Sequence, residues 1–295
     1  MENLSQDRFS RYILLMIKGK IKYLESWVIT ALVLIFGLSF TTPVLARDFL
    51  LLQSATTTQN SGLYDVILPK FTADTGIDVR VVAVGTGQAL RNARNCDADV
   101  LLVHDRVAEE IFIKDGYGAR RHKVMHNDFV LIGPEDDPAG VAGAGTVAEA
   151  FSRILQEKAR FVSRGDDSGT HKAERRIWTD LGENPEAYSG DWYLDIGNGM
   201  STAIHFALET RSYILSDRAT WTALRNKTGS RILFAGDPVL FNQYSVIQIN
   251  EAHCPDIEKN KAEAFAKWIL SPRGQTAIAS YQRDGVPLFI PNAGP

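Results

Sequence analysis

The segment Phe161–Lys172, which reads FVSRGDDSGTHK, carries side chains whose types and order suggest that it binds an anion. Its first residues are typical of the end of a short strand, and a helix is predicted directly after it, over Ala173–Leu181. At such a turn the first N–H groups of the helix and the positive end of its dipole face outward. Ser168 and Thr170 add hydroxyl donors, and Arg164 adds a permanent positive charge with a planar set of N–H donors. The segment therefore predicts an anion-binding turn.

Two other interpretations of this turn stay open. Arg164 could pair with Asp166 or Asp167 in an ordinary capped turn that binds nothing. Ser168 and His171 could also be a nucleophile and its base. However, DDSGT differs from the G-x-S-x-G elbow, and catalytic partners meet through the fold rather than by adjacency. No catalytic residue is therefore expected, and His171 is expected to be solvated. The histidines also lack a metal-ligand spacing, so no bound metal cation is expected.

Three other turns have the same character, a strand followed by small or hydroxyl residues and then a helix. The first runs over Ser54–Gly62 after the strand Phe49–Gln53, and the second over Gly85–Gln88 after the strand Asp78–Val84. The third is Gly197–Thr202, before a helix that ends at Thr210. Glycine permits close approach of the backbone to a ligand, and the threonines add donors. Together with the segment around Arg164, these turns strengthen the prediction of an anion site.

The elements that position these turns alternate between strand and helix, which indicates a mostly parallel α/β sheet or two such sheets. In such folds ligands bind at the carboxyl ends of the strands. The remaining strands are predicted at Asp99–Val103, Val124–Gly133, Asp191–Ile196, Tyr213–Ser216, Arg231–Phe234 and Tyr244–Asn250. The remaining helices are predicted at Leu63–Thr75, Ala89–Asn95, Arg106–Lys114, Thr146–Ala159, Arg218–Arg225, Asp256–Leu270 and Pro272–Tyr281.

Three local features carry their own expectations. Asn60 or Ser61 is the expected N-cap of the helix that ends at Thr75. Pro69 lies inside that helix and is expected to kink or shorten it. The basic run at 120–123 (RRHK) is expected to be a solvated loop.

The first 46 residues have the pattern of a secretory signal. Basic residues precede the apolar run Val28–Phe40, and Val44-Leu45-Ala46 supplies small residues where a signal peptidase needs them. We therefore expect cleavage after Ala46 and a periplasmic product. The run is too short to favour spanning a bilayer, but a retained anchor, or a start at Met16, stays an alternative.

The net charge and the cysteine content limit which partners and which covalent links we expect. The net charge of the chain is −3, and it becomes more negative without residues 1–46, which disfavours nucleic acid as a partner. An anion must therefore be bound by local donors. Cys96 and Cys254 are the only cysteines, and in an oxidising compartment they could pair or remain separate thiols.

With these residues in view, the chain resembles the TupA-type tungstate-binding proteins, the solute-binding subunits of a tungstate ABC importer. The resemblance rests on motifs spread in order over residues 50–290. They are ATTT at 55–58, SGL at 61–63, LPKF at 68–71, VAVGTGQA at 82–89, DADVLLVH at 97–104, VMHNDFV at 124–130 and SRGDDSGTH at 163–171. The first loop of the family usually reads TTTS, and Gln59 stands where that serine would be.

The resemblance implies a two-lobed periplasmic binding protein fold of type II, with two crossover strands and the ligand in the cleft between the lobes. The crossovers are expected near 128–130 and 241–244. Lobe one is then 47–128 plus 243–295, and lobe two is 129–242.

The resemblance also implies the ligand contacts, in both lobes, with a backbone N–H as the contact of Met200. The implied residues are Thr57, Thr58 and Thr86 in lobe one, and Arg164, Ser168, Thr170, Met200 and Ser201 in lobe two.

The implied ligand is tungstate, with molybdate as the companion expectation. Both are fully deprotonated dianions at neutral pH, which suits a site made of donors alone. Phosphate keeps a proton and needs an acceptor, which Asp166 or Asp167 could supply, and the SRGDDSGT turn also resembles phosphate-binding proteins. Phosphate binding is therefore the alternative within this class, and a membrane-anchored oxyanion sensor is the alternative outside it. The expected protein is a monomer without cofactor that delivers its ligand to the permease subunits at the inner membrane.

Overall fold

A computed structural model describes residues 49–283 and 285–294, and these residues belong to one compact unit. The predicted signal segment and its cleavage after Ala46 lie outside the described residues. Within the described ranges, no helix is long and apolar enough to cross a membrane.

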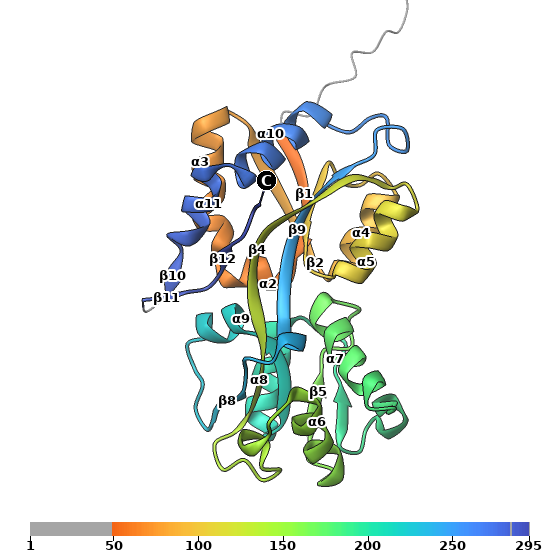
Figure 1. Cartoon of the computed structure of the whole chain (residues 1–295), viewed down its shortest axis with the longest axis vertical. Coiled ribbons are helices and arrows are strands. Elements are labelled where there is room, and N and C mark those ends of the chain that lie inside the picture. Colours follow the sequence, from red (N-terminus) through yellow and green to blue (C-terminus); the bar gives the residue numbers. More distant parts are fainter. Residues whose placement is uncertain (1–48, 284, 295) are drawn as a thin grey trace, which may run out of the picture. The chain divides into compact units, whose positions relative to one another are not determined.

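The strands form a mixed sheet in which the long strand β4 is the common member (Figure 1). Their order is β2-β1-β3-β9-β4-β7-β5-β6, and β8 and β12 also pair with β4. The pairs among β1, β2 and β3 and among β5, β6 and β7 are parallel, as expected, whereas β9 and β4 pair antiparallel with their neighbours. The strands are β1 (Phe49–Ala55), β2 (Asp78–Val84), β3 (Val100–Val103), β4 (Gly118–Pro134), β5 (Phe161–Ser163), β6 (Tyr193–Asp195), β7 (Tyr213–Asp217), β8 (Ser230–Phe234), β9 (Phe241–Ile249) and β12 (Ile290–Pro291).

Strand β4 changes partners part-way along its length. Its residues 118–128 pair with β9, from Gly118 opposite Ile249 to Asp128 opposite Phe241. From Phe129 onward it pairs with β7 and β8 instead. The chain therefore passes from one group of strands to the other through β4 and returns through β9.

Helices cover both faces of each group of strands (Figure 1). Beside β1, β3 and β9, one face carries α3, α10 and α11 and the other carries α4 and α5. Beside β5 and β7, one face carries α6 and α7 and the other carries α8 and α9. The helices are α2 (Thr56–Ser61), α3 (Leu63–Thr75), α4 (Thr86–Arg94), α5 (Arg106–Lys114), α6 (Val147–Gln156), α7 (Gly169–Asp180), α8 (Met200–Thr210), α9 (Arg218–Ala223), α10 (Lys259–Leu270) and α11 (Pro272–Ala279).

The apolar core follows the period of the strands. In β9, Tyr244 and Val246 belong to one buried cluster, and Ile247 and Ile249 to the cluster on the opposite face. Successive side chains of a strand point to opposite faces, so a strand covered on both sides is apolar on both. Four hydrophobic clusters make up the core of the described residues. Two of them consist of residues before 129 and after 243, with Ala219 as the one exception, and the other two consist of residues within 129–240. The names lobe one and lobe two follow the predicted boundaries, which themselves stay a prediction.

The structure corrects the expectations for the first turn. Thr56–Ser61 is the short helix α2, and it ends at Gly62, whose φ of 85° suits a residue without a side chain. Gly62 also precedes Leu63 at the start of α3, so neither Asn60 nor Ser61 is the N-cap there. Pro69 does not shorten α3, which continues to Thr75. Packing of its apolar face against α10 and α11 outweighs the loss of one backbone hydrogen bond.

The basic run at 120–123 is strand, not a solvated loop. Arg121 pairs with Ile247 of β9 in the register of β4, and its guanidinium forms a salt bridge with buried Glu109 at 2.6 Å. Composition suggested a loop because the partner strand lies more than a hundred residues further on. Pairing with β9 supplies the backbone hydrogen bonds that make this segment a strand.

The end of the chain also departs from expectation. Helix α10 begins at Lys259 rather than at 256. After α11 the chain forms the hairpin β10 (Gln282–Arg283) and β11 (Val286–Pro287), and β12 then pairs with β4. The sequence prediction contained none of these three strands, because two-residue strands carry no recognisable period.

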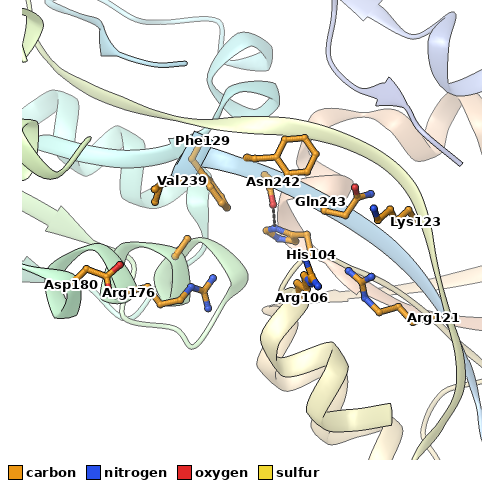
Figure 2. A pocket seen from close by; sticks show the side chains of 12 residues that line it. His104, Arg106, Arg121, Lys123, Phe129, Arg176, Asp180, Val239, Asn242 and Gln243 are labelled. Atoms are coloured by element: carbon orange, nitrogen blue, oxygen red, sulfur yellow. Dashed lines mark hydrogen bonds between the residues drawn. The ribbon is translucent and has the colours of Figure 1, made fainter. Parts of the chain in front are cut away.

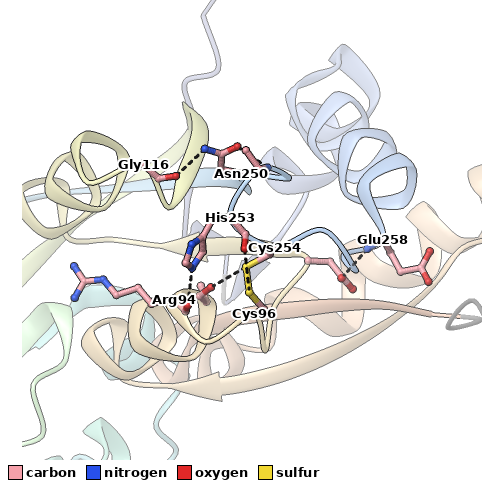
Figure 3. Close-up of a disulfide and its surroundings, with 10 residues drawn as sticks. Arg94, Cys96, Gly116, Asn250, His253, Cys254 and Glu258 are labelled. Atoms are coloured by element: carbon pink, nitrogen blue, oxygen red, sulfur yellow. Dashed lines mark hydrogen bonds between the residues drawn. A yellow bond between two sulfur atoms is a disulfide. The ribbon is translucent and has the colours of Figure 1, made fainter. Parts of the chain in front are cut away.

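The two cysteines form a disulfide, which settles the alternative that the sequence left open (Figure 3). Cys96 follows α4, and Cys254 lies in the loop after β9 and is fully buried. Both cysteines lie in lobe one, so the bond joins distant parts of that lobe.

Candidate functional site

The predicted binding turns meet where helices of both lobes begin. Arg164 Nη2 donates to Thr56 Oγ1 at 3.2 Å, and Asn60 Nδ2 donates to Ser201 Oγ at 3.1 Å. The backbone N–H of Gly87 donates to the carbonyl of Asp167 at 3.2 Å. Each of these bonds joins the range 47–128 to the range 129–242. The four turns that the sequence singled out therefore converge.

Several hydroxyl groups in this region are buried without a hydrogen-bond partner. Within the described part of the chain, Thr58 Oγ1, Thr86 Oγ1 and Thr170 Oγ1 make no hydrogen bond, and each residue is at most 1% exposed. A buried polar atom without a partner costs free energy. These three hydroxyls lie at converging turns and can donate to a ligand. A site for a ligand with many acceptor atoms requires such donors.

Arg164 supplies the charge. It is 2% exposed, and its Nη2 contacts Asp166 and Thr56. Its Nε and Nη1 have no partner among the residues described. These two atoms carry N–H groups that remain available to the oxygen atoms of an oxyanion. Asp166 also accepts from the backbone N–H of Ser168 at 3.2 Å, so this carboxylate braces the turn.

The other acidic residue of the turn has different contacts. Asp167 forms salt bridges with Arg91 of α4, at 2.6 Å, and with Lys172 of α7. Burial raises the pKa of Asp167, but hydrogen bonds from Lys172 and Arg91 outweigh that effect and hold the pKa below its usual value. Asp167 therefore forms salt bridges with basic side chains from both lobes.

The remaining predicted residues lie at helix starts. Ser168 caps α7 by accepting from the N–H of His171 at 3.2 Å, which leaves its O–H free to donate. Met200 is the first residue of α8 and is fully buried, so its N–H is one of the unbonded groups of that helix start. Ser201 accepts from Asn60. Thr57 lies 3.3 Å from Nε2 of His104.

Comparison with known proteins identifies the family. The model of the PBP superfamily domain matches residues 41–273. The tungstate-binding protein TupA of Peptoclostridium acidaminophilum is 44% identical over 252 residues, which cover 84% of this chain and 87% of that protein. The chain belongs to the TupA family of the PBP superfamily.

Solved structures of the TupA family have the same fold. Tungstate-binding TupA from Desulfovibrio alaskensis G20 has a TM-score of 0.71 and 45% identity, over 84% of this chain and all of that one. The tungstate ABC transporter structure from Geobacter sulfurreducens has a TM-score of 0.72 and 42% identity, over 80% of this chain and all of that one. The predicted binding-protein fold is thereby confirmed. The assignment of single residues to a ligand stays a prediction.

Sequence reasoning about this TupA family member missed His104. It follows β3 directly, and the rule that ligands gather at the carboxyl ends of strands could have singled it out. It is 4% exposed and bonds to Thr57 and Asn242. Burial lowers the pKa of His104 to about 4. His171 also differs from expectation, because it is half-buried and its Nδ1 accepts from the N–H of Asp167.

A pocket of about 260 Å³ adjoins the candidate site (Figure 2). His104 lines it and also bonds to Thr57, whereas none of the eight predicted ligand residues lines it. Arg106, Arg121 and Arg176 add positive charge, but each pairs with a carboxylate. The pocket is therefore a neighbour of the converging turns and not the site itself.

Proposed function

We propose that this chain binds tungstate, and molybdate as a close analogue, between its two lobes and delivers it to the permease of an ABC importer. The observation that carries the proposal is a set of buried donors that have no partner among the residues the structure describes: Thr58, Thr86, Thr170 and two N–H groups of Arg164. The TupA relatives, which are named as tungstate-binding proteins, support this choice of ligand.

Donor chemistry supports a fully deprotonated dianion. A tetrahedral dianion offers acceptors on every side. The site offers hydroxyls, guanidinium N–H groups and the positive ends of the dipoles of α4, α7 and α8. A protonated anion such as hydrogen phosphate would need a free carboxylate. Asp166 already pairs with Arg164, and Asp167 with Arg91 and Lys172.

The eight residues Thr57, Thr58, Thr86, Arg164, Ser168, Thr170, Met200 and Ser201 form the proposed site. Lobe one (47–128 plus 243–295) and lobe two (129–242) would move about β4 and β9, and the ligand would stabilise the closed arrangement by bonding to both. Contacts such as Arg91 with Asp167 and Arg176 with Asp105 join the two ranges and would add to closure.

The rest of the proposal follows from this role. The protein would be exported after cleavage at Ala46, act in the periplasm as a monomer, and need neither cofactor nor catalytic residue. The names of its relatives support binding and transport rather than catalysis.

Arg164→Ala tests the site. Removal of the buried charge should weaken tungstate binding by at least about 100-fold, because charged hydrogen bonds are the strong ones and the dianion would stay desolvated. Isothermal titration calorimetry measures the loss. The matched control is Arg273→Ala, which removes an exposed arginine paired with Asp74 and should leave the affinity unchanged. Equal affinity of wild type and Arg164→Ala would refute the assignment of this site.

A further inference from the structure

The imidazole of His104 is held at both nitrogens and packs against Tyr244 and Gly169. Its Nδ1 lies 2.9 Å from Asn242 Oδ1 and its Nε2 lies 3.3 Å from Thr57 Oγ1 (Figure 2 shows the contact with Asn242). The ring of Tyr244 stacks on it at 4.7 Å. Gly169, the first residue of α7, lies so close that a Cβ there would be 2.8 Å from His104 Cε1. His104 thus contacts lobe two as well as its own lobe.

The orientation of Asn242 determines which nitrogen of His104 carries the hydrogen. Asn242 Nδ2 donates to Asn127 Oδ1 at 2.7 Å and to the hydroxyl of Tyr244 at 3.3 Å. The Oδ1 atom of Asn242 therefore faces His104, and a carbonyl oxygen can only accept. With this orientation of Asn242, the hydrogen of His104 is on Nδ1.

The other nitrogen of His104 is an acceptor, because the ring is neutral at pH 7. Burial, together with the nearby charges of Arg164 and Arg176, lowers its pKa to about 4 against the opposing effects of Asn242 and Asp105. A neutral imidazole has one N–H group, so Nε2 accepts a hydrogen bond. The group that faces it is the hydroxyl of Thr57.

A threonine hydroxyl has a single hydrogen. We propose that His104 is the positioning residue of the oxyanion site, and that it accepts the hydroxyl hydrogen of Thr57. Thr57 then belongs to the proposed site through its place in the first loop, and not as a hydroxyl donor to the ligand. Thr58, Thr86 and Thr170 differ from Thr57, because their hydroxyls have no partner in the described ranges and remain available to an anion. This inference rests on the proposed function.

The same hydrogen bonds link the first binding loop to the strands that join the lobes. Asn127 of β4 and Asn242 of β9 are opposite each other in the sheet, at the point where β4 changes partners. From Asn242 the chain of bonds runs through His104 to Thr57 at the start of α2. A movement of β4 and β9 would thus shift Thr57 and, with it, the neighbouring donor Thr58.

The first test needs no ligand. Long-range ¹H–¹⁵N NMR of the imidazoles, with a His104→Gln variant to assign the signals, should show His104 protonated on Nδ1 and unprotonated on Nε2 at pH 7. A hydrogen on Nε2, or a charged ring, would overturn the proposal. Because this measurement is independent of tungstate, it separates failure of the inference from failure of the proposed function.

The second test is a double-mutant cycle on tungstate affinity, with the fold of each variant checked by circular dichroism. His104→Leu should weaken binding about tenfold by misplacing the first loop, and His104→Gln, whose amide oxygen can accept from Thr57, should recover part of the loss. Thr57→Val should weaken binding in the wild type but add nothing in the His104→Leu background. If Thr57→Val weakens binding equally in both backgrounds, Thr57 donates directly to the anion and the proposal is wrong.

Discussion

At the scale of single residues, burial can outweigh hydrogen bonding in setting the pKa of a carboxyl group. Glu174 shows this in lobe two. Its carboxyl is buried and accepts from Ser163 Oγ at 2.8 Å, Tyr193 OH at 2.8 Å and Trp178 Nε1 at 3.2 Å. Burial raises the pKa of Glu174 to about 7, although those three hydrogen bonds lower it. The folded protein therefore holds a proton on Glu174 in a pH range where the unfolded chain has released it.

Glu174→Gln should change how stability depends on pH. Between about pH 4.5 and 7 the folded state binds more protons than the unfolded state, so the free energy of unfolding should fall as pH rises through this window. Glutamine resembles the protonated acid, so the variant should lack this part of the fall, of order 1–3 kcal/mol. Urea unfolding of both proteins at pH 5 and pH 8 measures it. Buried Glu109 also has a raised pKa, but it adds the same pH dependence of stability to the wild type and to Glu174→Gln. Parallel pH curves would contradict this account of Glu174.

At the scale of elements, the close approach of α4 to the turn before α7 requires glycine at one position. A Cβ on Gly87 would lie 2.7 Å from the carbonyl oxygen of Asp167, and the side chain of Asp167 would be nearer still. These two elements belong to different lobes. If the lobes open as proposed, the clash would arise only in the closed arrangement.

Gly87→Ala should weaken tungstate binding by about tenfold or more without loss of stability. Alanine favours a helix over glycine by about 1 kcal/mol, so α4 itself should gain. Calorimetry and thermal unfolding measure the two effects separately. Gly145→Ala is the matched control, because the nearest atom to its Cβ is a Glu149 side-chain oxygen at 3.4 Å. Unchanged affinity of Gly87→Ala would show that α4 and this turn can separate in the bound state.

We expect the disulfide to affect stability rather than binding. It closes a sequence separation of 158 residues, so the replacement of both cysteines by serine should lower the free energy of unfolding by about 3–5 kcal/mol through the entropy of the unfolded chain. Chemical denaturation measures this. Tungstate affinity should stay the same, because both cysteines lie away from the converging turns. A loss of affinity with unchanged stability would contradict this separation.

The sequence predicted those elements whose signals are local. The turn around Arg164 was found because its charge, hydroxyls and helix start are contiguous. His104 was not, because its role depends on Thr57 and Asn242, 47 and 138 positions away in the chain. The strand character of the segment 120–123 depends on β9 in the same way. Long-range partners therefore account for most of what sequence reasoning missed.

At the scale of the whole molecule, the arrangement of the two groups of strands accounts for the position of the proposed site. Two groups of strands are joined through β4 and β9, and helices of both groups begin at the same place. At that place buried donors have no hydrogen-bond partner within the described part of the chain. Both groups of strands would thus supply hydrogen-bond donors to one acceptor-rich ligand. That ligand would bind more donors than either lobe has alone, and so it would favour the closed form.

The most direct test of this account is calorimetry of the purified protein with tungstate, molybdate, sulfate and phosphate at one pH. The account predicts tight binding of one tungstate per chain and no response to phosphate. Binding of phosphate with weak or absent tungstate binding would contradict the account. In that case Asp166 or Asp167 would have to act as an acceptor for the protonated anion.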